Sequence, residues 1–251
     1  METTAKFRPH VEVASDTEDL ARRSVQLFVK SAQQALDSRG RFCTALSGGL
    51  TPKRTFELLG TDPLARSLPW QKIEVFWVDE RYVPPDSPFS NYRLAADAFL
   101  DSVPIPPGNV HRIPTEHEDI GSAASAYETT LQDVFDVQAG QIPQFDLIIL
   151  GMGIDGHTGS LLPNSYAPFD MDALVSVVYA LGDNLSRITL THPVLQAARR
   201  LSVLVSGREK AQTLKDVLTS EPDEVRYPIH VLWPVLDRIV WLVDRDAAQA
   251  I

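Results

Sequence analysis

The segment LIILGMGIDGHTGSLLP, residues 147–163, decides the fold of this chain. It begins as an apolar run that favours a buried strand, and it then breaks at glycines on both sides of Asp155 and His157. Glycine permits backbone conformations and close approaches that a Cβ atom would block. A buried strand that ends in a glycine-rich turn is the place where an open α/β sheet holds its ligand. The segment therefore predicts an α/β fold with a binding site around His157.

Helical and strand-like patterns alternate along the rest of the chain. Strands are expected at 10–15, 41–47, 72–80, 145–151, 176–180, 187–191, 200–207 and 238–244, and helices after Ser15, from Thr51, and over 91–101, 119–137, 192–198 and 208–219. Ser15 and Glu18 have the spacing of a capping box. The strands are mostly continuous apolar runs, which indicates a mostly parallel sheet with helices on both faces. No repeat or linker divides the chain, so we expect one domain over residues 1–251.

Composition and charge exclude several classes of protein. The formal net charge is −10, whereas general nucleic-acid binding needs a basic surface. No apolar run is long enough to span a bilayer, and the N-terminal residues do not resemble a secretory signal. Cys43 is the only cysteine, and we interpret it as a buried, inert thiol. These features predict a cytoplasmic protein, a monomer because no long apolar stripe is evident, without nucleic-acid or membrane partners.

Polar or glycine-rich groups follow four of the expected strands. Because the carboxyl ends of parallel strands share one edge of a sheet, we expect these groups to lie close together. The four groups are Ser47-Gly48-Gly49-Leu50-Thr51-Pro52, Asp79-Glu80-Arg81, Asp155-Gly156-His157 and Ser206-Gly207-Arg208-Glu209-Lys210. The first can cradle a phosphate with its free N–H groups and hydroxyls, or it can be a plain glycine turn with Thr51 as an N-cap. Arg81, Arg187 and Lys210 can supply the positive charge that a phosphate needs.

The remaining chemistry centres on His157. Histidine is the side chain whose unperturbed pKa lies near physiological pH, which suits proton transfer on a small bound molecule. Either Asp155 or Asp79 can orient the ring, and the sequence does not choose between them. The other histidines are interpreted as surface or structural, and the four tryptophans as core. No His, Cys or carboxylate cluster has the spacing of metal ligands, so no metal site is expected.

Taken together, the motifs resemble the 6-phosphogluconolactonase family. They are SGGLTP, FWVDERYVP, SNYR, LGMGIDGHTGSLLP, RITLT and VSGREKA, and they occur in the family's order over nearly the whole chain. The resemblance implies a modified doubly wound, Rossmann-like fold and hydrolysis of 6-phospho-D-glucono-1,5-lactone in the oxidative pentose phosphate pathway, without a cofactor. It also implies that His157 is the general base. Arg81, Arg187, Lys210 and the Ser47–Gly49 turn would then contact the phosphosugar.

The sequence departs from that family pattern at several places. Gly159, Leu162 and Asn164 stand where the family usually has Ala, Phe and Gly, and LGDNLS at 181–186 replaces a segment that often contains Pro and Lys. The contribution of the 181–186 loop to substrate contact is therefore left open.

Three other functions compete with lactone hydrolysis. Glucosamine-6-phosphate deaminases carry a Glu five residues after the histidine, where this chain has Leu162, and Leu cannot move a proton. A serine hydrolase would use Ser47 in a loose nucleophile elbow. A non-catalytic sugar-phosphate-binding domain of a transcription regulator would carry a helix-turn-helix unit and a basic face, which neither the N-terminal pattern nor the acidic charge supports.

Overall fold

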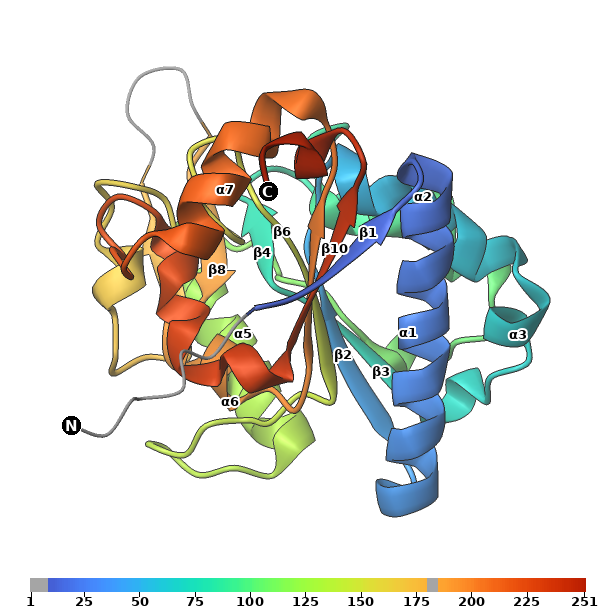
Figure 1. Cartoon of the computed structure of the whole chain (residues 1–251). Coiled ribbons are helices and arrows are strands. Elements are labelled where there is room, and N and C mark those ends of the chain that lie inside the picture. Colours follow the sequence, from blue (N-terminus) through green and yellow to red (C-terminus); the bar gives the residue numbers. More distant parts are fainter. Residues whose placement is uncertain (1–8, 180–184) are drawn as a thin grey trace.

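Seven parallel strands form the main sheet of the computed structural model, which describes residues 9–179 and 185–251. In sheet order they are β1 (His10–Ala14), β10 (Ile239–Asp244), β9 (Leu201–Val205), β6 (Leu147–Gly151), β2 (Phe42–Leu46), β3 (Ile73–Trp77) and β5 (Val110–His111). Helices cover both faces of this sheet, so the predicted mostly parallel α/β fold is confirmed (Figure 1).

The helices divide between the two faces. On one side of the sheet lie α1 (Thr17–Arg39), α2 (Leu50–Thr61) and α3 (Pro63–Arg66), and on the other lie α5 (Ile120–Phe135), α6 (His192–Ala197) and α7 (Ala211–Thr219) (Figure 1). The remaining α-helix, α4 (Asn91–Ala98), packs against α2. A short 3₁₀ turn over Arg208–Lys210 precedes α7, and an 11-residue 3₁₀ segment with a kink at Val235, Pro228–Arg238, leads into β10.

A second, antiparallel sheet was not predicted. Its strands are, in order, β4 (Asp79–Arg81), β8 (Arg187–Leu190) and β7 (Val175–Val178). The prediction of one strand over 72–80 was therefore wrong, because Val78 passes from one sheet to the other. Its N–H donates to Leu46 of the main sheet at 2.9 Å, and its carbonyl accepts from Leu190 of the small sheet at 2.7 Å. Because Val78 is buried where the chain leaves the main sheet for the small one, the apolar pattern of the sequence does not mark the boundary between β3 and β4.

Several predicted helix ends also need correction. The Ser15–Glu18 capping box is wrong by one residue, since Asp16 accepts the N–H of Asp19 at 2.8 Å while Asp19 accepts the N–H of Ser15 at 2.9 Å. Thr51 is not an N-cap, because α2 already begins at Leu50. Two further boundaries differ: the helix expected over 208–219 begins as a separate 3₁₀ turn, and β5 lies in a segment expected to be a connection.

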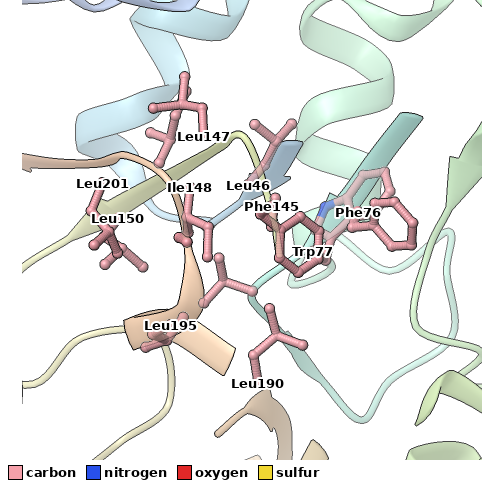
Figure 2. Packing of buried hydrophobic residues seen from close by; sticks show 14 of the residues in the cluster. Leu46, Phe76, Trp77, Phe145, Leu147, Ile148, Leu150, Leu190, Leu195 and Leu201 are labelled. Atoms are coloured by element: carbon pink, nitrogen blue, oxygen red, sulfur yellow. The ribbon is translucent and has the colours of Figure 1, made fainter. Parts of the chain in front are cut away.

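One continuous hydrophobic cluster lies under both sheets. Figure 2 shows side chains of β2, β3, β6 and β9 packed together with Leu190 of β8 and Leu195 of α6. Cys43 is buried in β2, as predicted, and burial raises the pKa of its thiol to about 12, which disfavours the reactive thiolate. Trp70, Trp77 and Trp241 are fully buried as predicted, and Trp233 is partly buried.

Bilayer-spanning helices were searched for across residues 9–179 and 185–251. None of the helices there has the length and apolar character needed to cross a membrane.

Candidate active site

The order in which the chain adds strands to the main sheet reverses between β2 and β6. From β2 the chain adds β3 and β5 on one side, and it then returns to add β6, β9 and β10 on the other. Ligands of open α/β sheets bind outside the carboxyl ends of the strands at such a reversal. The four predicted polar groups follow β9, β6, β2 and β3, which are consecutive in the sheet.

A pocket opens at this edge of the sheet. Nine predicted site residues line it: Ser47, Gly48, Gly49, Thr51, Asp79, Arg81, His157, Arg187 and Lys210. The tenth, Asp155, contacts the His157 ring. The pocket is completed by Leu50, Pro52, Asn91, Gly151, Met152, Gly153 and Gly159. Residues more than a hundred positions apart therefore form one site, although their roles in it remain predictions.

The turn after β2 presents unpaired polar groups to this pocket. Gly49 has φ = 101°, a conformation that side-chain-bearing residues rarely adopt, and it leads directly into α2. Ser47 is buried, and its Oγ has no hydrogen-bond partner among the described residues. A buried hydroxyl without a partner carries a desolvation cost, which a bound ligand can relieve. Because no base contacts Ser47, the geometry does not favour a serine nucleophile.

The histidine of the pocket is held by one carboxylate. The Nδ1 atom of His157 lies 2.6 Å from Oδ1 of Asp155, which also accepts the His157 backbone N–H at 3.2 Å. Burial acts to raise the pKa of Asp155, but the hydrogen bonds and charge of His157 outweigh it, and this pKa is lowered. Asp155 is therefore ionised near neutral pH and favours the tautomer with a proton on Nδ1, which leaves Nε2 free to accept one.

Glycine is required beside this pair. A Cβ atom on Gly153 would lie 2.2 Å from the His157 ring and 2.6 Å from Oδ1 of Asp155. Gly156 has φ = 78° and packs against Tyr227. The N–H of Ile229 donates to the Gly156 carbonyl at 3.0 Å. The glycines therefore let the loop pack closely around the imidazole, which explains why the apolar run of residues 147–151 is followed by glycines.

Asp79 has a different neighbour. Its carboxylate accepts the hydroxyl of Ser160 at 2.8 Å and is almost fully buried. No hydrogen bond or ion pair links Asp79 to His157 in the part of the chain that the structure describes. Of the two carboxylates that the sequence left open, Asp155 is therefore the one that contacts the imidazole.

Three cations line the pocket. Arg81 and Arg187 are directly opposite each other in the antiparallel β4–β8 pair, and Lys210 reaches the pocket from the turn after β9. Burial lowers the pKa of Arg187 and of Lys210. Across residues 9–179 and 185–251, no carboxylate lies within ion-pair distance of any of the three. The arrangement concentrates positive charge in an acidic protein, and a phosphate matches that charge.

Two neighbours of these groups were not predicted as site residues. Ser160 belongs to the glycine-rich segment and holds Asp79, whereas Asn91 belongs to the SNYR motif and lines the pocket. Both motifs are recognisable in the sequence. No spacing rule, however, predicts that Ser160 contacts Asp79 or that Asn91 reaches the pocket, because these contacts join segments that are distant in sequence. Residues 181–184 of the departing loop lie outside the described residues. No group of three or more metal-ligating side chains occurs in the described ranges.

The fold and the site define a Rossmann-like α/β protein with a cationic pocket and a histidine–aspartate pair at the carboxyl edge of its sheet. A family model described as "Glucosamine-6-phosphate isomerases/6-phosphogluconolactonase" matches residues 15–241, and the chain belongs to this family.

Named relatives agree with that assignment. The chain is 40% identical over 241 residues to a 6-phosphogluconolactonase of Synechocystis sp., covering 96% of this chain and 98% of the relative. It is also similar to the solved 6-phosphogluconolactonase of Trypanosoma brucei, with a TM-score of 0.85, 27% identity, and coverage of 98% and 100% of the two chains.

The fold alone does not separate the two activities in the family name. A monomeric glucosamine-6-phosphate deaminase superposes with a TM-score of 0.81 at 20% identity, over 96% of this chain and all of that one. At that identity the likeness concerns the fold only. The choice between lactonase and deaminase therefore depends on the relatives' names and on the site, where Leu162 packs partly buried against the core.

Proposed function

We propose that this protein is a 6-phosphogluconolactonase, which hydrolyses 6-phospho-D-glucono-1,5-lactone to 6-phospho-D-gluconate. The observation that carries the proposal is the joint presence in one pocket of His157, held by Asp155, and three cations that have no carboxylate partner among the described residues. His157 supplies a proton acceptor, and the three cations supply a binding site for the phosphate. Relatives at 40% identity carry this name over nearly their whole length.

His157 acts as the general base in this proposal. Nε2 takes a proton from water while the water oxygen bonds to C1 of the lactone, giving a tetrahedral oxyanion. As the carbonyl reforms, the bond from C1 to the ring oxygen breaks, and the imidazolium returns its proton to that oxygen. Asp155 stabilises the imidazolium between the two steps. General-base assistance of this kind contributes about 10²–10⁴-fold to the rate.

The oxyanion needs donors that are not already occupied. The N–H of Gly153 donates to the His157 carbonyl at 2.9 Å and the N–H of Gly156 to the Gly153 carbonyl at 3.1 Å, so neither is free. Among the described residues, the Gly48 and Gly49 amides have no protein acceptor. They and the pocket arginines are the candidate donors, and one such donor is worth about 2.7–4 kcal/mol.

The test is an assay of lactone disappearance, corrected for spontaneous opening. His157→Ala should lower kcat by about 10²–10⁴-fold, because the proton acceptor is lost. His117→Ala is the matched control, since His117 is exposed and outside the pocket, and it should leave kcat unchanged. Retention of most of kcat by His157→Ala would contradict the general-base role.

Substrate identity is tested separately with the unmodified chain. Turnover of glucosamine 6-phosphate instead of the lactone would favour the deaminase alternative, and binding without turnover of either would favour a sugar-phosphate-binding domain. A monomeric state, a cytoplasmic location and the absence of nucleic-acid partners stay predictions.

A further inference from the structure

The SNYR segment, residues 90–93, has no role in the proposed chemistry, although Asn91 lines the pocket. It forms the start of α4, with Ser90 as the N-cap residue. The segment lies about ten positions from Arg81 in sequence, and the structure brings the two into contact. Its contacts show what it contributes to the site.

A buried carboxylate anchors this segment to β4. Glu80 is only 2% exposed and accepts the backbone N–H groups of Arg81, Asn91 and Tyr92 at 2.7–2.8 Å, together with the Ser90 hydroxyl at 2.9 Å. A carboxylate at a helix N-terminus that accepts several N–H bonds is a strong attachment. Glu80 therefore fixes the position of Asn91 relative to Arg81.

Both polar atoms of the Asn91 side chain are hydrogen-bonded, and these bonds fix its orientation. Its Nδ2 donates to the Asp79 carbonyl at 2.8 Å, and its Oδ1 accepts from Nη1 of Arg81 at 3.0 Å. A flipped amide would place a donor against the guanidinium and an acceptor against the carbonyl. The same Nη1 atom donates to the Phe89 carbonyl at 2.9 Å, so two acceptors hold one guanidinium nitrogen.

Asn91 also touches the glycine turn after β2. A Cβ atom on Gly48 would lie 1.7 Å from Oδ1 of Asn91, so no side chain at position 48 is compatible with the observed Asn91. The amide thus joins the turn that carries Ser47 to the arginine that faces the pocket. Within the described ranges, Nε and Nη2 of Arg81 have no protein acceptor and remain available to a ligand.

We propose that Asn91 is a positioning residue, which holds the Arg81 guanidinium beside the Ser47–Gly49 turn so that its free N–H groups meet the anionic part of the substrate. This inference rests on the proposed function for its kinetic consequence but not for the contact itself. Asn91 acts through Arg81, so its effect on activity must disappear when Arg81 is absent.

A double-mutant cycle tests this dependence. Asn91→Ala should lower kcat/KM about 10-fold in the Arg81 protein and less than about 2-fold in an Arg81→Ala background, because the residues act as a unit. Asn109→Ala is the matched control. The Asn109 side-chain amide, like that of Asn91, donates to the backbone, here to two carbonyls, but it lies away from the pocket. It should leave kcat/KM unchanged. Equal losses in both backgrounds would overturn the proposal.

A second readout does not depend on turnover. NMR spectroscopy reports on the Nε–Hε group of Arg81, whose resonance is assigned as the one missing from the spectrum of Arg81→Lys. This resonance should shift and broaden in Asn91→Ala and stay unchanged in Asn109→Ala. An unaltered resonance would overturn the proposal even if the lactone proves not to be the substrate. Asn91→Ser keeps a small polar side chain at this position and serves if Asn91→Ala does not fold. The same shift is expected from it.

Discussion

The cations on the outer surface of α1 and α2 differ from those of the pocket in what surrounds them. On the outer surface three arginines are matched by carboxylates: Arg22 lies 3.3 Å and Arg54 2.7 Å from Glu18, and Arg23 lies 3.0 Å from Asp19. The Arg54 hydrogen bond lowers the pKa of Glu18, which keeps the acid charged. Such exposed pairs are screened by water and salt and contribute little to stability.

The pocket has the opposite arrangement. Arg81 and Arg187 face each other across two strands, where like charges destabilise a sheet, and no carboxylate of the described residues forms an ion pair with either. Burial lowers the pKa of Arg187 and outweighs the charge of Asp79, which acts to raise this pKa. Burial disfavours the charged forms of Arg187 and Lys210 further. The fold tolerates this cost at one edge of the sheet and avoids it on the outer surface. The difference indicates that an anion from solution completes the pocket.

Among the variants of these cations, the largest expected effect comes from removing one that lines the pocket. Arg187→Met keeps most of the side-chain volume and should lower kcat/KM by roughly 10- to 150-fold, because a hydrogen bond to a charged group contributes about 1.5–3 kcal/mol. The outer-surface variant Arg22→Met is the control and should leave kcat/KM unchanged. Similar losses in the two variants would break the distinction between the two sets of cations.

A smaller effect concerns pH. Lysine loses its charge as pH rises, and because burial lowers the pKa of Lys210, that loss begins at a lower pH than for an exposed lysine. Binding of 6-phosphogluconate, measured by calorimetry between pH 7 and about 10, should therefore weaken on the alkaline side. Lys210→Arg should move this weakening to higher pH, since arginine stays protonated. Superimposable pH profiles would show that Lys210 does not contact the anion.

The smallest effect is on the stability of the unliganded protein. Arg54→Met should lower Tm by at most about 3 °C, and less in high salt, because it removes exposed ion pairs. Arg187→Met should leave Tm almost unchanged, because the repulsion with Arg81 that it removes is offset by the lost attraction to Asp79. Thermal unfolding at low and high salt measures both. A clear loss of Tm in Arg187→Met would mean that the pocket arginines already have a stabilising partner.

Much of the site could be predicted because strand ends carry a local signal. The turns after β2, β6 and β9 each combine an apolar run with glycine, and parallel strands bring such ends to one edge whatever the details of the connections. The small sheet could not be predicted in the same way. Its strand β4 is the charged segment Asp79–Arg81, which directly follows an apolar run, and Val78 is buried where the chain leaves one sheet for the other.

The sequence by itself determined the α/β class, the shared edge and the residues placed there, because backbone periodicity and glycine turns are properties of short segments. Only the tertiary structure decided which side chains meet: Asp155 on the His157 ring, Arg187 opposite Arg81, and Asn91 on Arg81. The register of β4 against β8 joins residues about a hundred positions apart. Such contacts depend on packing between distant segments, and no local pattern encodes them.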